Sequence, residues 1–169
     1  MQRRDFWKIC LAAGWGFIIP GWLSPKAEAG LRIGDIPPRM ILNDLKGTPF
    51  NLPGAFKGKV ALIHFWASWC PSCRKEMILL ETIHQHYGPK GILPCSIDVG
   101  ETKEAAQQYL RNVKITYPVL LDPRSSTARQ FGVSGIPTSY VLNRETIIRF
   151  KILGEPNQEG LDRIIKGLL

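Results

Sequence analysis

The chain has 169 residues, of which 44% are hydrophobic and 21% are charged, and its formal net charge is +8. This balance is typical of a globular domain with its own core and excludes a disordered or fibrous chain. Residues 1–29 hold four Lys and Arg against two Asp and Glu, so residues 30–169 carry +6, scattered without a dense basic run. We therefore expect no nucleic-acid partner.

The first 29 residues have the pattern of an export signal. Arg3, Arg4 and Lys8 form a basic start, residues 9–23 are mostly apolar, and Ala27-Glu28-Ala29 offers a small-x-small cleavage site. The sequence therefore predicts cleavage after Ala29. It also predicts that the remaining domain is periplasmic or otherwise extracytoplasmic.

Three alternatives remain for this segment. The run RRDFWK resembles a twin-arginine signal, which pairs two arginines with a following Phe and Lys. An ordinary secretory signal with an incidental arginine pair fits equally well. An uncleaved membrane anchor is the third alternative, although the apolar run is shorter than the about 20 residues that a spanning helix needs.

Residues 30–169 predict one domain in which strands and helices alternate. We expect a Gly- and Pro-rich lead-in over 30–38, then strands over 40–42, 49–52, 59–67, 91–99, 118–121, 139–142 and 146–153. We expect helices over 73–87, 101–111, 125–131 and 159–169, the first of them beginning near Pro71. This order indicates an α/β fold with a central mixed sheet flanked by helices and an N-terminal hairpin extension.

The motif WCPSC, from Trp69 to Cys73, lies between the central strand and the first helix. A thiol at a helix N-terminus is stabilised as the thiolate, which is the form that attacks disulfides. We therefore expect Cys70 to be exposed and reactive, and Cys73, one turn further, to be shielded and resolving. A bridge between these two closes almost no loop, so the spacing disfavours a structural crosslink.

A zinc site is the weaker interpretation of these cysteines. Structural zinc needs four ligands, yet His84 and His86 point to different sides of a helix and His64 lies in an apolar strand. No metal site is predicted. Cys95 alternates with apolar neighbours, so we expect a buried, inert thiol.

Two segments carry a resemblance to a known family. FWASWCPSC at 65–73 and GIPTSYVLN at 135–143 resemble the thioredoxin superfamily, and within it the exported, reducing TlpA/ResA-like thiol-disulfide oxidoreductases of cytochrome c maturation. The resemblance covers residues 30–169 and implies a thioredoxin-like fold, a Cys70–Cys73 disulfide and no cofactor. It also implies a disulfide-bearing protein substrate such as apocytochrome c, a membrane thiol carrier as reductant, and a monomer.

The resemblance also places residues outside the cysteine pair. Pro137 matches the cis-proline of the family, and Ile136 matches the residue whose backbone pairs with a bound peptide. An ordinary trans turn before a strand is the alternative for Pro137. Trp69 is expected on the docking surface.

Glu76 matches the acidic residue that follows the second cysteine in the reducing branch. It lies on the same helical face as Cys73 and could take the Cys73 proton when a mixed disulfide resolves. The alternative is a solvent-exposed glutamate that interacts only with the helix dipole. His64 lies where many thioredoxins carry a buried aspartate, and we favour a structural role for it.

Three other functions compete with a reductase. An oxidant that inserts disulfides would use the same cysteines but would need a strongly stabilised thiolate. A copper chaperone is disfavoured, because no histidine follows His86. A peroxidase is disfavoured, because Ile63 and Ala67 stand where a proline and a hydroxyl residue would organise a peroxide pocket.

Overall fold

A seven-stranded mixed sheet organises residues 30–169, the part of the chain that this computed structural model describes. The predicted export signal, residues 1–29, lies outside the described residues. The strands follow the spatial order β2-β1-β5-β4-β3-β6-β7. Their bounds are Met40–Asp44 for β1, Pro49–Leu52 for β2, Val60–Trp66 for β3, Ile92–Val99 for β4, Val119–Asp122 for β5, Thr138–Leu142 for β6 and Ile148–Leu153 for β7.

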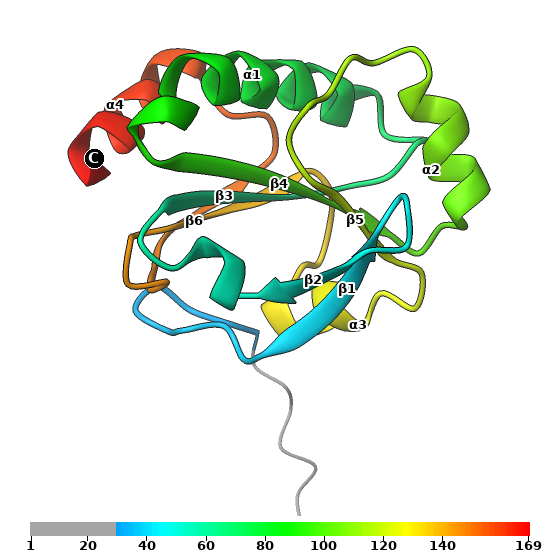
Figure 1. The fold of residues 1–169 in the computed structure, drawn as a ribbon, viewed down its shortest axis with the longest axis horizontal. Helices are drawn as coiled ribbons and strands as arrows, with labels where there is room; N and C mark the ends of the chain where they lie inside the picture. Colours follow the sequence, from blue (N-terminus) through cyan, green and yellow to red (C-terminus); the bar gives the residue numbers. More distant parts are fainter. Residues whose placement is uncertain (1–29) are drawn as a thin grey trace, which may run out of the picture.

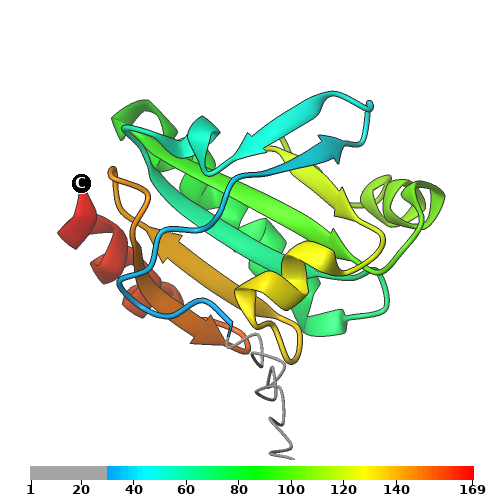
Figure 2. The same cartoon turned by 90° about the horizontal axis from the view of Figure 1, so that it is seen from below.

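Helices cover both faces of this sheet. The α-helices are α1, Pro71–Tyr87; α2, Lys103–Leu110; α3, Ser126–Phe131; and α4, Gln158–Leu168; two short 3-10 helices are η1, Gly54–Phe56, and η2, Gly88–Lys90. Helices α1 and α4 lie on one face and α3 on the other (Figure 1). The view from below shows α3 crossing in front of the strands (Figure 2).

Strand β3 forms the centre of the core because all seven of its residues are buried. It pairs in parallel with β4 and antiparallel with β6. Since side chains alternate along a strand, Ile63 and Phe65 pack with Phe131 on the α3 face. Leu62 packs instead with Leu80 under α1. Neighbouring residues of one strand therefore supply two separate cores, and His64 falls on the α1 side.

The predicted fold class is confirmed, with shifts at several element ends. Helix α2 begins at Lys103 because the Thr102 side chain caps it by accepting a hydrogen bond from the Ala105 amide. Strand β7 begins at Ile148, later than predicted, since Thr146 has a φ of 65° and closes a turn onto Asn143. From residue 30 onward, no helix is both long and apolar enough to cross a membrane.

Candidate active site

The two cysteines of the CPSC motif form a disulfide at the first turn of α1. Cys70 is the N-cap residue, and its sulfur accepts a hydrogen bond from the Cys73 amide at 3.3 Å. Pro71 occupies the first helical position, where its missing N–H costs nothing. The Ser72 hydroxyl lies 3.6 Å from the Cys70 sulfur. The helix start thus directs a hydrogen-bond donor, together with the positive end of its dipole, at Cys70.

The expectation that Cys70 is exposed is wrong for this oxidised form, in which only 4% of the residue is accessible. Its sulfur turns inward as the helix cap and is bonded to the fully buried Cys73. Trp66 and Met77 belong to the same buried cluster. The neighbouring Trp69 is instead 70% exposed. Its place on a docking surface stays a prediction.

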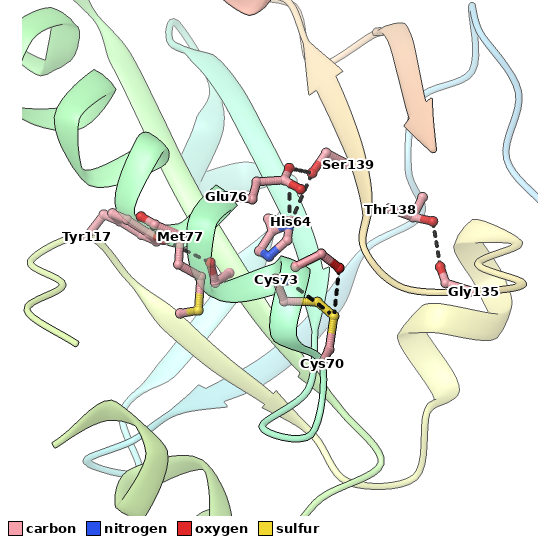
Figure 3. A network of polar contacts seen from close by, with 11 residues as sticks. His64, Cys70, Cys73, Glu76, Met77, Tyr117, Gly135, Thr138 and Ser139 are labelled. Atoms are coloured by element: carbon pink, nitrogen blue, oxygen red, sulfur yellow. Dashed lines mark hydrogen bonds and ion pairs between the residues drawn. A yellow bond between two sulfur atoms is a disulfide. The ribbon is translucent and has the colours of Figure 1, made fainter. Parts of the chain in front are cut away.

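The loop before β6 approaches the cysteine pair from the other side of the site. The Ile136–Pro137 peptide bond is cis, which confirms that prediction, and a second cis bond, Leu52–Pro53, was not predicted. Ile136 packs against the cluster that contains the cysteines. The Thr138 hydroxyl donates to the Gly135 carbonyl at 2.6 Å and fixes the turn (Figure 3).

Glu76 lies beneath the helix start with only 1% of its surface accessible. The alternative of a solvent-exposed glutamate is therefore wrong. One carboxylate oxygen, Oε1, accepts a short hydrogen bond from the Ser139 hydroxyl and lies 3.2 Å from Nδ1 of His64. Oε1 of Glu76, on α1, thus has one partner on β3 and one on β6. These contacts join the three elements through a single buried polar cluster (Figure 3).

The sequence interpretation separated His64 from Glu76, whereas the structure brings them into contact. His64 is fully buried, and its Nδ1 also lies 3.2 Å from the Ser139 hydroxyl oxygen. Ser139 was not singled out from the sequence. Its signal was available in strand alternation, because Ser139 is the register partner of His64 across the β3–β6 pair.

A second buried acid at the carboxyl end of β4 was also missed. Asp98 is fully buried and is the register partner of Trp66. Burial, followed by the contact with Glu101, raises the pKa of Asp98 to about 8. Glu101 in turn accepts hydrogen bonds from the backbone amide and hydroxyl of Ser68, at 2.5 and 2.6 Å. Glu101 therefore holds the loop that leads into Trp69.

The third cysteine of the domain takes no part in this arrangement. Cys95 is free and fully buried, as predicted, and burial raises the pKa of its thiol. Such a thiol is a poor nucleophile at physiological pH. Across residues 30–169, no three His, Cys, Asp or Glu side chains gather in an arrangement that could hold a metal ion.

A disulfide that caps a helix after a central strand and faces a cis-proline loop defines a thioredoxin-like thiol-disulfide oxidoreductase. The model of the AhpC/TSA family matches residues 33–151, and the chain belongs to this family.

Curated and solved relatives agree with this assignment. The thiol-disulfide oxidoreductase ResA of Bacillus thuringiensis subsp. konkukian is 30% identical over 139 residues, which cover 82% of this chain and 80% of that protein. A crystal structure of a putative thiol:disulfide interchange protein DsbE from Chlorobium tepidum is 28% identical and covers 82% of this chain and 99% of its own, with a TM-score of 0.78. A putative protein disulfide isomerase from Bacteroides thetaiotaomicron, also 28% identical, covers 82% and 91%, with a TM-score of 0.74.

Proposed function

We propose that this chain is an exported protein disulfide reductase that acts through Cys70 and Cys73. The Cys70 thiolate attacks a substrate disulfide, so that one substrate sulfur leaves and the other becomes bonded to Cys70. Cys73 then loses its proton, and its sulfur attacks Cys70, forming the internal disulfide and releasing the second substrate sulfur. Each released sulfur takes up a proton, one from Cys73 and the other from solvent, because Cys70 reacts as a thiolate. Two electrons thus pass from the cysteine pair to the substrate.

The buried carboxyl group of Glu76 is the main observation that supports reduction of substrate disulfides by this protein. A negative charge near the cysteine pair disfavours a thiolate there. A couple becomes strongly oxidising when its reduced form is stabilised, and a thiolate of low pKa provides such stabilisation. Because Glu76 is 1% exposed and three residues beyond Cys73, its charge is poorly screened by solvent. Glu76 therefore supports a reductant over an oxidant that inserts disulfides.

The surface around the disulfide suits a protein substrate. Trp69 presents a large, 70% exposed ring beside the buried cysteines. The loop that contains the cis Ile136–Pro137 bond lies against the same cluster, and its backbone offers an edge to which an extended peptide could add. These features support Trp69, Ile136 and Pro137 as substrate-binding residues.

The predicted export of the domain determines which partners it needs. Outside the cytoplasm the oxidised pair must be recharged by a reductant, and a membrane thiol carrier is the class that fits. The resemblance to the cytochrome c maturation group makes apocytochrome c, with its haem-attachment cysteines, the proposed substrate class. The chain is proposed to work as a monomer without a cofactor.

The reduction potential of the Cys70–Cys73 couple tests the direction of electron flow. The protein is equilibrated in thiol–disulfide buffers, and the oxidised fraction is followed by tryptophan fluorescence, with a Cys73→Ser variant as the control without an internal disulfide. A potential toward about −270 mV supports a reductase. A potential toward about −120 mV would instead identify an oxidant and remove this proposal.

The substrate class needs its own experiment. The reduced protein is mixed with an oxidised peptide that carries a Cys-x-x-Cys-His segment, and with a disulfide peptide of the same length that lacks this segment. Faster reduction of the first peptide supports apocytochrome c. Equal rates would contradict that substrate class without affecting the proposed reductase activity.

A further inference from the structure

The contacts of His64 restrict where its protons lie. Two oxygens lie near its Nδ1, that of the Ser139 hydroxyl and Oε1 of Glu76, each at 3.2 Å. The other ring nitrogen, Nε2, is buried and has no hydrogen-bond partner among residues 30–169. A neutral imidazole carries one proton, so one nitrogen donates and the other offers a lone pair.

The proton is better placed on Nδ1. There it points at the Glu76 carboxylate, whose Oε1 also receives the Ser139 hydroxyl proton. A proton on Nε2 would be a buried donor without an acceptor, and Nδ1 would then face the carboxylate with its lone pair, which is repulsive. The arrangement therefore leaves Nε2 with a free lone pair inside the protein.

This lone pair is on the side of the ring away from Glu76. His64 reaches α1 from β3, and Glu76 is one helical turn beyond Cys73 on the same helix face. Figure 3 shows the ring between the Glu76 carboxylate and the cysteine pair. In the oxidised form the Cys73 sulfur is bonded to Cys70 and has no proton to give. Because Nδ1 is turned to Glu76, Nε2 lies on the side of the ring toward the cysteine pair.

We propose that His64 Nε2, and not Glu76, accepts the proton of Cys73 during resolution of the mixed disulfide. This inference rests on the reductase cycle proposed above and assigns its proton transfer. The Cys73 S–H bond breaks, and its proton forms an N–H bond at Nε2. The Cys73 thiolate then attacks Cys70, and the substrate thiolate that leaves takes a proton back from the imidazolium. Glu76 acts through His64, because its carboxylate on Nδ1 fixes the tautomer and stabilises the imidazolium.

The groups that face His64 from each packed element fit this role. Helix α1 contributes Glu76 as the only acidic side chain in hydrogen-bond contact with it among residues 30–169. Strand β6 contributes the neutral Ser139. From β4, the register partner Ser96 bonds the hydroxyl of Tyr117, and burial raises the pKa of that phenol, so it stays neutral. Apart from Glu76, therefore, no buried acid in the described part of the chain is in contact with His64 to compete for the proton that it exchanges with Cys73.

Substitutions can separate the base from its positioning group. His64→Asn keeps a side-chain N–H near the place of Nδ1 but removes the base, whereas Glu76→Gln keeps the base and removes the charge behind it. The matched control is His86→Asn, which changes an exposed histidine of α1. Reduced protein is mixed with a small aromatic disulfide, whose coloured thiolate is released first by attack of Cys70 and then by resolution through Cys73.

The second release reports the proposed step. His64→Asn should slow it about 10²-fold near neutral pH, the usual contribution of a general base, and the rate should recover as hydroxide replaces the base at high pH. Glu76→Gln should slow it less, and His86→Asn should leave it unchanged. A wild-type rate and pH profile in His64→Asn would overturn the inference. If the wild-type protein does not release the first coloured thiolate, this result would instead contradict the nucleophilic role of Cys70 in the proposed function.

The unmodified protein offers a test that does not depend on whether a variant folds. Nitrogen-15 NMR distinguishes the two histidine tautomers, and the His64 signal of the oxidised protein should show a protonated Nδ1 and a bare Nε2. The opposite tautomer, with its proton on Nε2, would leave no base facing Cys73 and would overturn the inference.

Discussion

Replacing Asp98 by Asn should make the protein more stable at neutral and alkaline pH. Asp98 is fully buried at the end of β4, and none of the residues 30–169 gives its oxygens a well-formed hydrogen bond. Burial and the neighbouring Glu101 raise its pKa from 3.8 to about 8. Asn keeps the size of the side chain and removes its charge at every pH.

The sign follows from proton binding. Between pH 3.8 and about 8 the native protein holds a proton on Asp98 that the unfolded chain has released. The free energy of unfolding therefore falls as pH rises through this window, by at most about 1.4 kcal/mol per pH unit. Relaxation around the buried group and its coupling to Glu101 reduce the sum, and we expect about 3 kcal/mol across the window.

Urea unfolding of the oxidised protein at several pH values between about 4 and about 8 measures this effect. The Asp98→Asn variant should match the wild type at the acidic end and exceed it by about 3 kcal/mol at the alkaline end. Glu104→Gln removes an exposed carboxylate of α2 and serves as the control. Parallel curves for Asp98→Asn and the wild type would refute the assignment of a raised pKa to this residue.

Four further substitutions test other parts of the structure. Trp69→Ala should raise KM for a disulfide protein about tenfold and leave the reaction with a small disulfide unchanged, because the exposed ring only contacts a large substrate. Cys95→Ala should leave the reduction potential unchanged, since its buried thiol is remote from exchange. Phe131→Ala should lower the free energy of unfolding by about 3–5 kcal/mol in urea, because the ring is fully buried against Phe65. Ser139→Ala should cost about 1–3 kcal/mol in the same assay, because Glu76 loses a donor.

The fold could be predicted from the sequence because the local sequence signals agree with the tertiary structure. The apolar run of β3 and the Pro71 helix start each favour the conformation that the tertiary structure adopts. The cis bond before β6 was instead expected from the family resemblance, because the local sequence also allows a trans turn. Cys70 was placed correctly along the chain but with the wrong exposure. Capping of α1 by its sulfur turns the side chain inward, and the bond to the buried Cys73 holds it there.

The polar clusters were harder to predict than the elements, because they depend on register between strands. His64 and Ser139 are 75 positions apart and meet only through the antiparallel β3–β6 pair. Asp98 lies at the end of an apolar run, where an acidic residue is normally the first solvent-exposed position. Its burial depends on the pairing of β4 with β3 and on the loop above it, neither of which periodicity reveals.

The two faces of strand β3 have different roles: one packs into the core and the other lines the active site. Its odd-numbered residues, Ile63 and Phe65, pack into the aromatic core on the α3 face, whereas His64 and Trp66 face α1 and the cysteines. Because adjacent side chains point to opposite faces, a change on one face leaves the other packing intact. Substitutions in the α3-side core should therefore lower stability at an unchanged potential. Substitutions at His64 or Glu76 should change the pH dependence of thiol exchange far more than they change packing, which is what a proton-handling cluster requires.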